Sequence, residues 1–299
     1  METIEFYAHP TEKMNGLELT VEMDPHKPFS VSPEDQEQLD RDWAERGYTR
    51  SSPIGTLFDV SFNEQTGETR LRYRLTEYKI YSGIAFPALP DTEEKLSRQL
   101  KDFMRASANG CAVETLDGKI VIQRKKEGII GGGMLESGAG GMMIYDYLTG
   151  KLDWRQQARE NIARELSIKE ASQIISLTPK AVFSSRGPAH VPATKGYFTG
   201  CYSGMVSSLT QVHISYDTII KIFDKKEVQE VIGVDTKDLA AFILEPPTKG
   251  DRGFSGDSCA ALLSILPAAE FYDTVEKINS RETARIKFGS LRDGKFRER

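Results

Sequence analysis

GGGMLESGAGG, residues 131–141, is followed by an apolar, tyrosine-bearing segment and then by DWRQQARENIARELSIKEA, residues 153–171. The second run predicts a helix over residues 153–171, because Asp153 suits an N-cap and no Gly or Pro interrupts the run. Apolar residues recur at every fourth position and line one stripe that must face a core: Trp154, Ala158, Ile162 and Leu166. A glycine-rich turn that carries Glu136 ahead of such a helix is an arrangement that can hold a phosphate group, and it is also an ordinary way for a chain to turn.

The stretch upstream predicts a β-hairpin. In ETLDGKIVIQRKKEG, residues 114–128, Asp117-Gly118 is a strong turn signal, and Ile120 and Ile122 fall on one face of the second strand. The chain therefore runs strand, turn, strand, glycine-rich turn and helix.

This order resembles a Nudix domain over residues 108–245. The Nudix signature runs Gly, five residues, Glu, seven residues, Arg-Glu-apolar, one residue, Glu-Glu, one residue and Gly. On this chain the first Gly is Gly133, and the Arg-Glu-apolar triplet is Arg164, Glu165 and Leu166. The resemblance implies an α/β fold, namely a Nudix-type α/β/α sandwich with a mixed sheet.

The chain departs from this signature in length and in charge. Thirty residues separate Gly133 from Arg164 where the family has thirteen, and Ala139 stands where a Glu is expected. The Glu-Glu pair, which in the family holds magnesium together with the first Glu, is replaced by Ile168 and Lys169. The sequence thus predicts a degenerate Nudix box that binds magnesium weakly or not at all. Restoring the pair with Ile168→Glu and Lys169→Glu is then expected to create metal binding.

The resemblance and the charges nominate a small set of functional residues. The candidate catalytic residues are Glu165 and Glu136, and the candidate metal ligands are Glu165 and Glu230. The candidate ligand-binding residues are Arg164, Lys169, Arg186, Gly132 and Gly133. The alternative for Glu165 and Lys169 is an ordinary helical ion pair of roughly 0.3–0.5 kcal/mol, and the alternative for Glu227 or Glu230 is a surface carboxylate.

Residues 1–105 are predicted to form an N-terminal α+β region, ahead of a Nudix-like domain over residues 106–299. A helix is predicted from Pro33 to Glu45, with Ser32 as its cap, and a second helix over residues 91–106. The Nudix-like part is preceded by a helix that ends near Trp43, a Pro-Ile-Gly stretch, a hairpin and then Leu75-Thr76-Glu77-Tyr78-Lys79. This layout resembles long-N-terminus Nudix proteins that cleave UDP-sugars. At the other end, residues 273–286 predict a charged helix and residues 292–299 a frayed tail.

Composition limits the classes of function. Hydrophobic residues at 39% and charged residues at 28% are typical of a soluble globular protein. A net charge of −5 argues against a general nucleic-acid binder. The sequence contains no run of about 18 apolar residues, so it predicts no membrane-spanning helix. Three isolated cysteines, Cys111, Cys201 and Cys259, suggest reduced thiols and a cytoplasmic location.

Two functions remain open at this point. The first is a Nudix-fold protein that binds a nucleoside-diphosphate-like ligand or a partner, with weak or altered catalysis. The alternative is an active magnesium-dependent hydrolase that cleaves nucleoside diphosphates linked to another moiety such as a sugar. The expected ligand in both cases is a small phosphorylated molecule.

Overall fold

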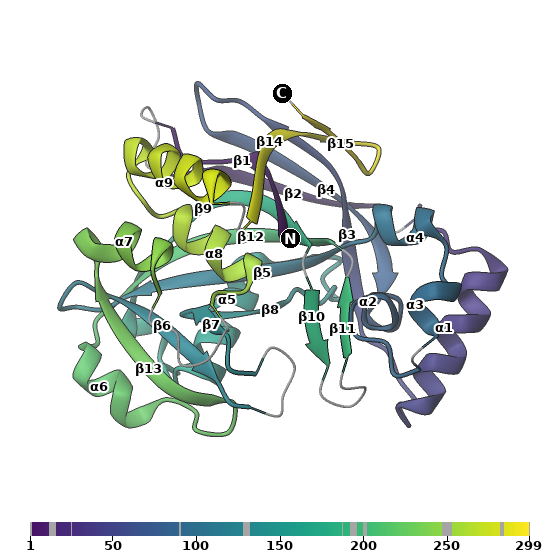
Figure 1. The fold of residues 1–299 in the computed structure, drawn as a ribbon, viewed down its shortest axis with the longest axis horizontal. Coiled ribbons are helices and arrows are strands. Elements are labelled where there is room, and N and C mark those ends of the chain that lie inside the picture. The colour runs from purple at the N-terminus through teal and green to yellow at the C-terminus, as the bar shows by residue number, and fades with distance from the viewer. Residues whose placement is uncertain are drawn as a thin grey trace.

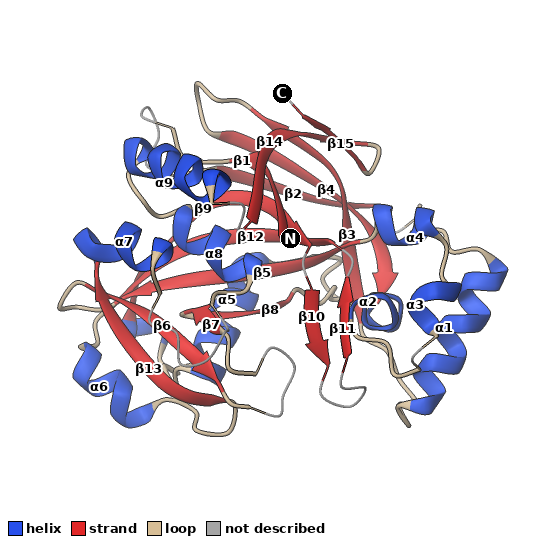
Figure 2. Ribbon diagram, viewed as in Figure 1, coloured by secondary structure: helices blue, strands red, loops and turns tan. Residues whose placement is uncertain are grey.

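The computed structural model describes residues 2–11, 16–24, 26–89, 91–127, 132–186, 188–191, 196–199, 202–246, 253–281 and 284–298. The fold is mixed α/β, and runs of strands are separated by helices along the chain. Figure 2 shows the strands and helices of the molecule in different colours. The strands are β1 Glu2–Ala8, β2 Glu18–Asp24, β3 Pro53–Phe62, β4 Glu68–Glu77, β5 Arg105–Glu114, β6 Lys119–Lys125, β7 Leu135–Ser137, β8 Ala139–Met142, β9 Ile174–Arg186, β10 Pro188–Val191, β11 Gly196–Thr199, β12 Tyr202–Val212, β13 Val228–Asp235, β14 Ala284–Arg292 and β15 Lys295–Glu298. The helices are α1 Pro33–Glu45, α2 Tyr78–Ala85, α3 Thr92–Lys95, α4 Arg98–Phe103, α5 Trp154–Glu165, α6 Tyr216–Ile222, α7 Leu239–Leu244, α8 Gly256–Leu263 and α9 Ala268–Ser280.

One large mixed sheet closes on itself. Its order is β13-β6-β5-β12-β9-β1-β14-β3-β4-β2, and β3 also pairs with β5 at Thr56 and Ala106 (Figure 1). The strands β5, β12, β9, β1, β14 and β3 therefore form a closed circuit. The predicted mixed α/β class is confirmed, whereas the predicted plain sandwich is wrong, because this additional pairing joins the two arms of the sheet.

Buried side chains from most strands of the circuit form one apolar cluster. Its members include Tyr7 on β1, Leu57 on β3, Val182 on β9, Val206 on β12 and Leu291 on β14. Alternate residues of a strand face opposite sides of a sheet, so contact among these side chains indicates that they point inward. The charged side chain of Arg105 on β5 is buried as well, and it is satisfied by Tyr7 Oη at 3.0 Å, by Glu5 and by two backbone carbonyls.

Helices cover both faces of the part of the sheet that contains β6. Ile122 packs in a cluster with α8 and α9, whereas its neighbour Val121 packs in a cluster with α5. The helices α1 to α4 lie at the other end of the molecule, around a cluster that includes Leu39 and Leu100 (Figure 1). The two faces of β6 therefore have different environments, and neighbouring charged residues of β6 meet different partners.

Several local predictions are confirmed. Helix α1 runs from Pro33 to Glu45, and Ser32 Oγ accepts from the Asp35 backbone N–H at 3.1 Å. The β5–β6 hairpin turns at Gly118, whose φ of 73° is a conformation that suits glycine. The stripe of α5 is buried as predicted, with Trp154, Ala158 and Ile162 in the core.

Two predictions at the ends of the domains are wrong. The helix predicted over residues 91–106 is split into the short helices α3 and α4, and Arg105 already begins β5. The helix predicted over residues 273–286 ends at Ser280, and the predicted frayed tail contributes to β14 and β15. In β14, Ala284, Ile286, Gly289 and Leu291 are buried, because the strand lies between β1 and β3.

Strands from both predicted regions share the sheet. Strands β1 and β3, from residues 1–105, pair with β9, β14 and β5, from residues 106–299. The boundary at residues 105 and 106 stays a prediction.

The packing of α5 predicts a large cost for one substitution. Leu166 follows the helix, is fully buried and belongs to the cluster on the α5 face of the sheet. Leu166→Ala should lower the free energy of unfolding by roughly 2–5 kcal/mol, because it leaves a cavity. Leu148→Ala is the matched control, since Leu148 is 97% exposed. Urea unfolding of both variants checks this, and equal midpoints would contradict the described packing.

Candidate functional site

The candidate site lies on the face of β6 and β7 that is covered by α5. In the register of these strands Gln123 is opposite Glu136, and Lys125 follows on the same face of β6. Lys125 Nζ lies 3.1 Å from Glu136 Oε2, and each side chain is 23% exposed. The site therefore contains an ion pair that is held between two strands and is open on one side.

The backbone around Lys125 is fixed by hydrogen bonds. The Lys125 N–H donates to Met134 O at 3.0 Å, and the Gly133 N–H donates to Lys125 O at the same distance. Gly133 has a φ of 78°, which explains the need for glycine in this turn. Gly132 and Gly133 lie next to the site, but the Gly133 N–H is already used inside the protein. Their role in ligand binding stays a prediction.

The rest of the glycine-rich stretch forms strands and packs closely, rather than forming a flexible loop. A Cβ on Gly138 would lie 2.7 Å from Cys111 O and from a Val113 methyl group, so β8 can approach β5 only with glycine there. A Cβ on Gly141 would lie 2.9 Å from Asn161 Oδ1 on α5. These glycines bring α5 onto the strands, and with it the carboxylate of Glu165.

Glu165 is the last residue of α5, and the charges of Glu136 and Lys125 influence its pKa. The helix begins where the Asp153 side chain accepts from the backbone N–H groups of Arg155 and Gln156. The Glu165 side chain is only 9% exposed, and its Oε1 accepts from Arg164 at 2.7 Å. Burial raises the pKa of Glu165 to about 7, against the opposing effect of Arg164. A carboxyl with this pKa can accept or donate a proton near neutral pH.

Lys125, Glu136, Glu165 and Glu227 form a charged cluster, and their charges shift the pKa values within it. Burial raises the pKa of Glu136, and the carboxylates of Asp257 and Glu227 add to this, although Lys125 opposes it. Burial alone would lower the pKa of Lys125, but the carboxylates of Glu136, Glu165 and Glu227 raise it above its usual range. Lys125 is therefore a firmly charged ammonium among carboxylates.

Helix α5 ends earlier than the sequence predicts. Leu166 is its C-cap, and Ser167 has a φ of 58°, which takes the chain out of the helix. Lys169 is exposed beyond this point, and Ile168 is buried in the core with an exposed fraction of 1%. The alternative of a helical ion pair between Glu165 and Lys169 is therefore wrong, because Lys169 lies beyond the end of the helix.

Two other candidates lie outside the cluster. Glu230 is opposite Arg124 in the pairing of β13 with β6, and their side chains form an ion pair at 3.2 Å. Because Arg124 and Lys125 are neighbours on β6, their side chains face opposite sides of the sheet. The ion pair of Arg124 and Glu230 therefore lies on the other face of the sheet from Glu165. The structure does not bring Glu165 and Glu230 together. Arg186 pairs with Asp102, at 3.1 Å.

The sequence reasoning missed Lys125. Alternation along β6 from Val121 places Lys125 on the α5 face, but the carboxylates that meet it there come from segments distant in sequence. Glu227, considered only as an auxiliary carboxylate, is close to it, because the Lys126 N–H donates to Glu227 O at 2.9 Å.

Magnesium does not fit the residues as they are placed. The Lys125 ammonium lies 3.1 Å from Glu136 Oε2, and an ammonium opposes the close approach of a divalent cation. Across the described ranges, no group of three or more His, Cys, Asp or Glu residues is arranged to hold a metal ion. The described chemistry of this site is thus that of a lysine and carboxylates.

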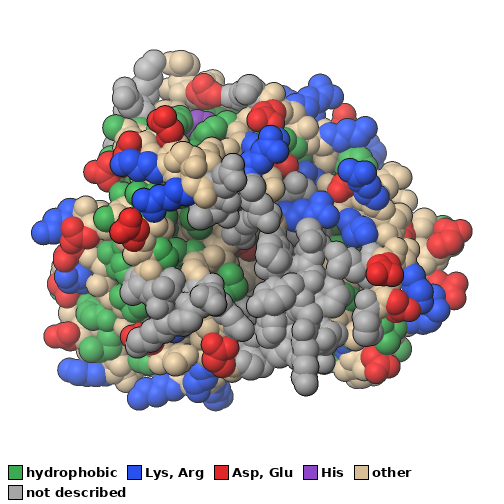
Figure 3. All heavy atoms as spheres, in the orientation of Figure 1, with side chains coloured by type: hydrophobic (Ala, Val, Ile, Leu, Met, Phe, Trp, Pro, Cys, Tyr) green, Lys and Arg blue, Asp and Glu red, His purple; other side chains and the backbone are tan. Residues whose placement is uncertain are grey.

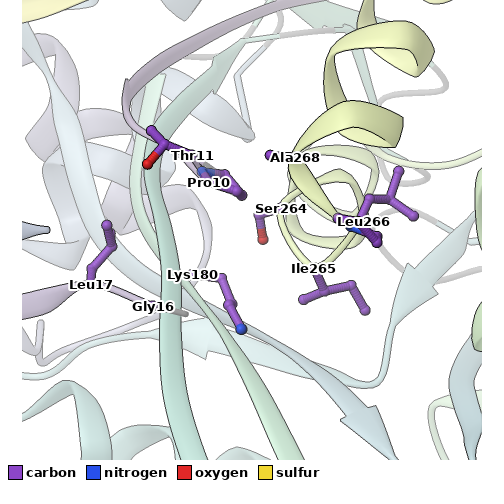
Figure 4. A pocket seen from close by; sticks show the side chains of 10 residues that line it. Pro10, Thr11, Gly16, Leu17, Lys180, Ser264, Ile265, Leu266 and Ala268 are labelled. Atoms are coloured by element: carbon purple, nitrogen blue, oxygen red, sulfur yellow. The ribbon is translucent and has the colours of Figure 1, made fainter. Parts of the chain in front are cut away.

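Other surface features do not extend the site. A pocket of about 210 Å³ lies between Lys180 on β9 and the segment that joins α8 to α9 (Figure 4). It shares no residue with the cluster and is smaller than the roughly 300–1,000 Å³ of typical ligand pockets. On the face shown in Figure 3, acidic and basic side chains are interspersed rather than gathered by sign.

Comparison with known proteins gives only distant likenesses. No protein-family model matches the chain, and no curated protein matches it. Among solved structures, DR0079 from Deinococcus radiodurans is 16% identical with a TM-score of 0.35 over 53% of this chain and 81% of its own. The Nudix hydrolase RenU from M. smegmatis is 13% identical with a TM-score of 0.32, over the same shares of the two chains. Likenesses at these identities and TM-scores establish neither a family nor a function for this chain. No helix in the described part of the chain is long and apolar enough to cross a membrane.

The raised pKa of Glu165 predicts a dependence of stability on pH. Between its ordinary value of 4.5 and about 7, the folded protein binds more protons than the unfolded chain, so stability falls as pH rises through this window. The loss is on the order of 3 kcal/mol at most, measured by urea unfolding from about pH 5 to pH 8. Glu165→Gln should flatten this slope, whereas Glu160→Gln, at an exposed position of the same helix, should leave it unchanged. Parallel slopes for the wild type and Glu165→Gln would contradict the described burial.

The position of Ile168 changes the expected result of restoring the glutamate pair. Ile168→Glu places a carboxyl in an apolar core and should lower the free energy of unfolding by roughly 3 kcal/mol or more. Lys169→Glu alone, at an exposed position, should change it by less than about 0.5 kcal/mol. Thermal unfolding of the two single variants separates these outcomes. A fully stable Ile168→Glu variant that binds magnesium would contradict the described burial of Ile168 and support a helix that continues through residue 168.

Proposed function

We propose that this chain binds a small phosphorylated ligand of the nucleoside-diphosphate type on the face formed by Lys125, Glu136 and Glu165, with weak or altered catalysis. The observation that carries the proposal is the position of Lys125, whose ammonium is partly exposed at the centre of the cluster. An ammonium on a lysine is a common partner of phosphate oxygens. The Nudix-like order of hairpin, glycine-rich turn and Arg-Glu-Leu helix supports the choice of ligand class.

Arg164 supplies the second positive charge. Its side chain is 53% exposed at the end of α5, and it donates to Gly140 O at 3.0 Å as well as to Glu165. A phosphate group that lies between Lys125 and Arg164 would gain two charge-assisted contacts. Lys169 and Arg186, nominated from the sequence, are not required by this geometry.

Protonation of Glu165 lowers the electrostatic cost of binding. With Glu136, Glu165 and Glu227 all ionised, the carboxylates outnumber the two cations and repel a phosphate. Because the pKa of Glu165 is about 7, this carboxyl takes up a proton readily as the anion arrives. Ligand affinity is therefore expected to rise as pH falls below about 7.

The same carboxyl supports only limited chemistry. Glu165 can act as an acid or base toward a bound water or phosphate oxygen, but the lysine does not supply the charge of a divalent cation to a departing phosphate. Slow hydrolysis, or binding without hydrolysis, fits this arrangement best. We propose a protein partner as the alternative to the small ligand. We also propose a cytoplasmic location for the protein.

Calorimetry with UDP, ADP and UDP-glucose, each with EDTA and with magnesium, tests the proposed binding. The wild type should bind at least one of these ligands in EDTA. Lys125→Met should weaken binding by at least about tenfold, because it removes the central charge. Lys119→Met is the matched control on the same strand, since Lys119 pairs with Asp235 instead. Equal affinities for the wild type and Lys125→Met would place the ligand elsewhere.

A hydrolysis assay separates the two functions. Turnover of UDP-glucose or ADP-sugars by the wild type should be slow and insensitive to EDTA. Rapid turnover that needs magnesium and is abolished by Glu165→Gln would establish the alternative, an active magnesium-dependent hydrolase.

A further inference from the structure

The strands β2, β4, β3 and β14 are neighbours in one arm of the sheet (Figure 1). Leu71 on β4, Val60 on β3 and Leu291 on β14 face the enclosed apolar cluster. Residues that alternate with them therefore lie on the outer face of this arm. A pocket of about 160 Å³ opens on the outer face. It is lined by Asp59, Ser61, Arg70, Arg72 and Arg292.

The strand register brings three guanidinium groups to this pocket. Arg72 is opposite Asp59 in the pairing of β4 with β3. Arg70 is opposite Ser61, two residues away along the same strands. Arg292 comes from β14, on the other side of β3. Cations from two neighbouring strands thus flank the central strand of the pocket.

Two of the guanidinium groups are held in place by one carboxylate. Glu22 Oε1 on β2 lies 3.2 Å from Arg70 Nε, and Glu22 Oε2 accepts from Arg72 Nε at 3.1 Å. Arg72 Nη1 is 4.0 Å from Asp59 Oδ2, which is too long for a hydrogen bond. A guanidinium carries five N–H donors, so a contact through Nε leaves its terminal NH₂ groups for another acceptor.

The third guanidinium group stands on a fixed backbone. Asp59 Oδ1 accepts from the Asp293 N–H at 2.7 Å and so anchors the turn that follows Arg292. Within the described ranges, neither the exposed Arg292 side chain nor the Ser61 hydroxyl has a hydrogen bond or an ion pair. Three guanidinium groups against the carboxylates of Asp59 and Glu22 leave a net positive charge, which favours an anion.

A second hollow, of about 350 Å³, adjoins the pocket and shares Ser61 and Arg70 with it. Its far end is acidic, because Glu18 on β2 is opposite Glu68 on β4 and both side chains are exposed. Neighbouring strands lie about 4.8 Å apart, so these like charges repel one another. In the part of the chain that the structure describes, neither carboxylate has an ion pair. A cationic group at this end would relieve the repulsion.

We propose that this outer face binds a small phosphate monoester that also carries an ammonium group. The phosphate lies against Arg70, Arg72 and Arg292, because the planar fork of arginine matches phosphate oxygens in charge and geometry. The ammonium lies over Glu18 and Glu68. These two carboxylates would repel a second phosphate, so the site selects against diphosphates and is independent of the proposed function.

Calorimetry at low ionic strength tests the inference, because salt screens exposed charges. The wild type should bind O-phosphoethanolamine with a dissociation constant on the order of 1 mM or lower, and inorganic phosphate at least about threefold more weakly. Arg292→Gln should weaken O-phosphoethanolamine binding by at least about tenfold. Arg285→Gln is the matched control, since Arg285 is exposed on the same strand and lies outside the pocket. No binding by the wild type, or equal affinities for the wild type and Arg292→Gln, would overturn the inference.

A variant of the acidic end tests the ammonium group by itself. Glu68→Gln should weaken O-phosphoethanolamine binding by at least about threefold without weakening the binding of inorganic phosphate. An equal loss for both ligands would overturn the inference. If circular dichroism shows that Arg292→Gln is unfolded, Arg70→Gln removes a guanidinium group from the other side of β3, and the same titration applies.

Two variants distinguish this site from the charged cluster around Lys125. Lys125 lines neither hollow, so Lys125→Met should leave O-phosphoethanolamine binding unchanged. Arg292→Gln should in turn leave the binding of UDP in EDTA unchanged. Loss of O-phosphoethanolamine binding in Lys125→Met but not in Arg292→Gln would place the phosphate at the Lys125 cluster and overturn the inference.

Discussion

The fold depends on the insertion of β14 between β1 and β3. This strand pairs in parallel with β1 from Glu2 to Phe6 and in antiparallel with β3 at Leu291. Together with the pairing of β3 and β5 it closes the circuit, and it covers edges of β1 and β3 that would otherwise be open to pairing with other chains. The apolar cluster that includes Tyr7, Val60 and Leu291 is enclosed by the same closure.

The candidate site depends on how this sheet sorts its side chains. Because neighbouring residues of β6 face opposite sides, Arg124 and Lys125 lie in different environments although they are adjacent in sequence. Arg124 is neutralised by Glu230 on one face, and Lys125 meets Glu136 and the end of α5 on the other. The glycines of β8 let α5 approach closely enough for Glu165 to join them.

Local signals in the sequence were sufficient for part of this structure. The cap at Ser32, the turn at Gly118 and the stripe that begins at Trp154 depend on residues close in sequence, and the structure confirms each of them. The end of α5 was missed because Ser167, not a glycine, takes a positive φ. The strand β14 was missed because its partners, β1 and β3, lie far away in sequence, and no local pattern reports such pairing. Lys125 was missed because its carboxylate partners come together only in the fold.

Closure by the last long strand has a consequence for synthesis on the ribosome. Strand β1 is made long before β14, which begins at Ala284 and is one of its two neighbours in the sheet. Until residues 284–292 have left the ribosome, β1 and β3 carry backbone groups without their final partners. Such late, long-range pairing slows folding and exposes strand edges during translation. The edges of β1 and β3 therefore stay open to pairing with other chains for longer than in a fold of the same size built from local hairpins.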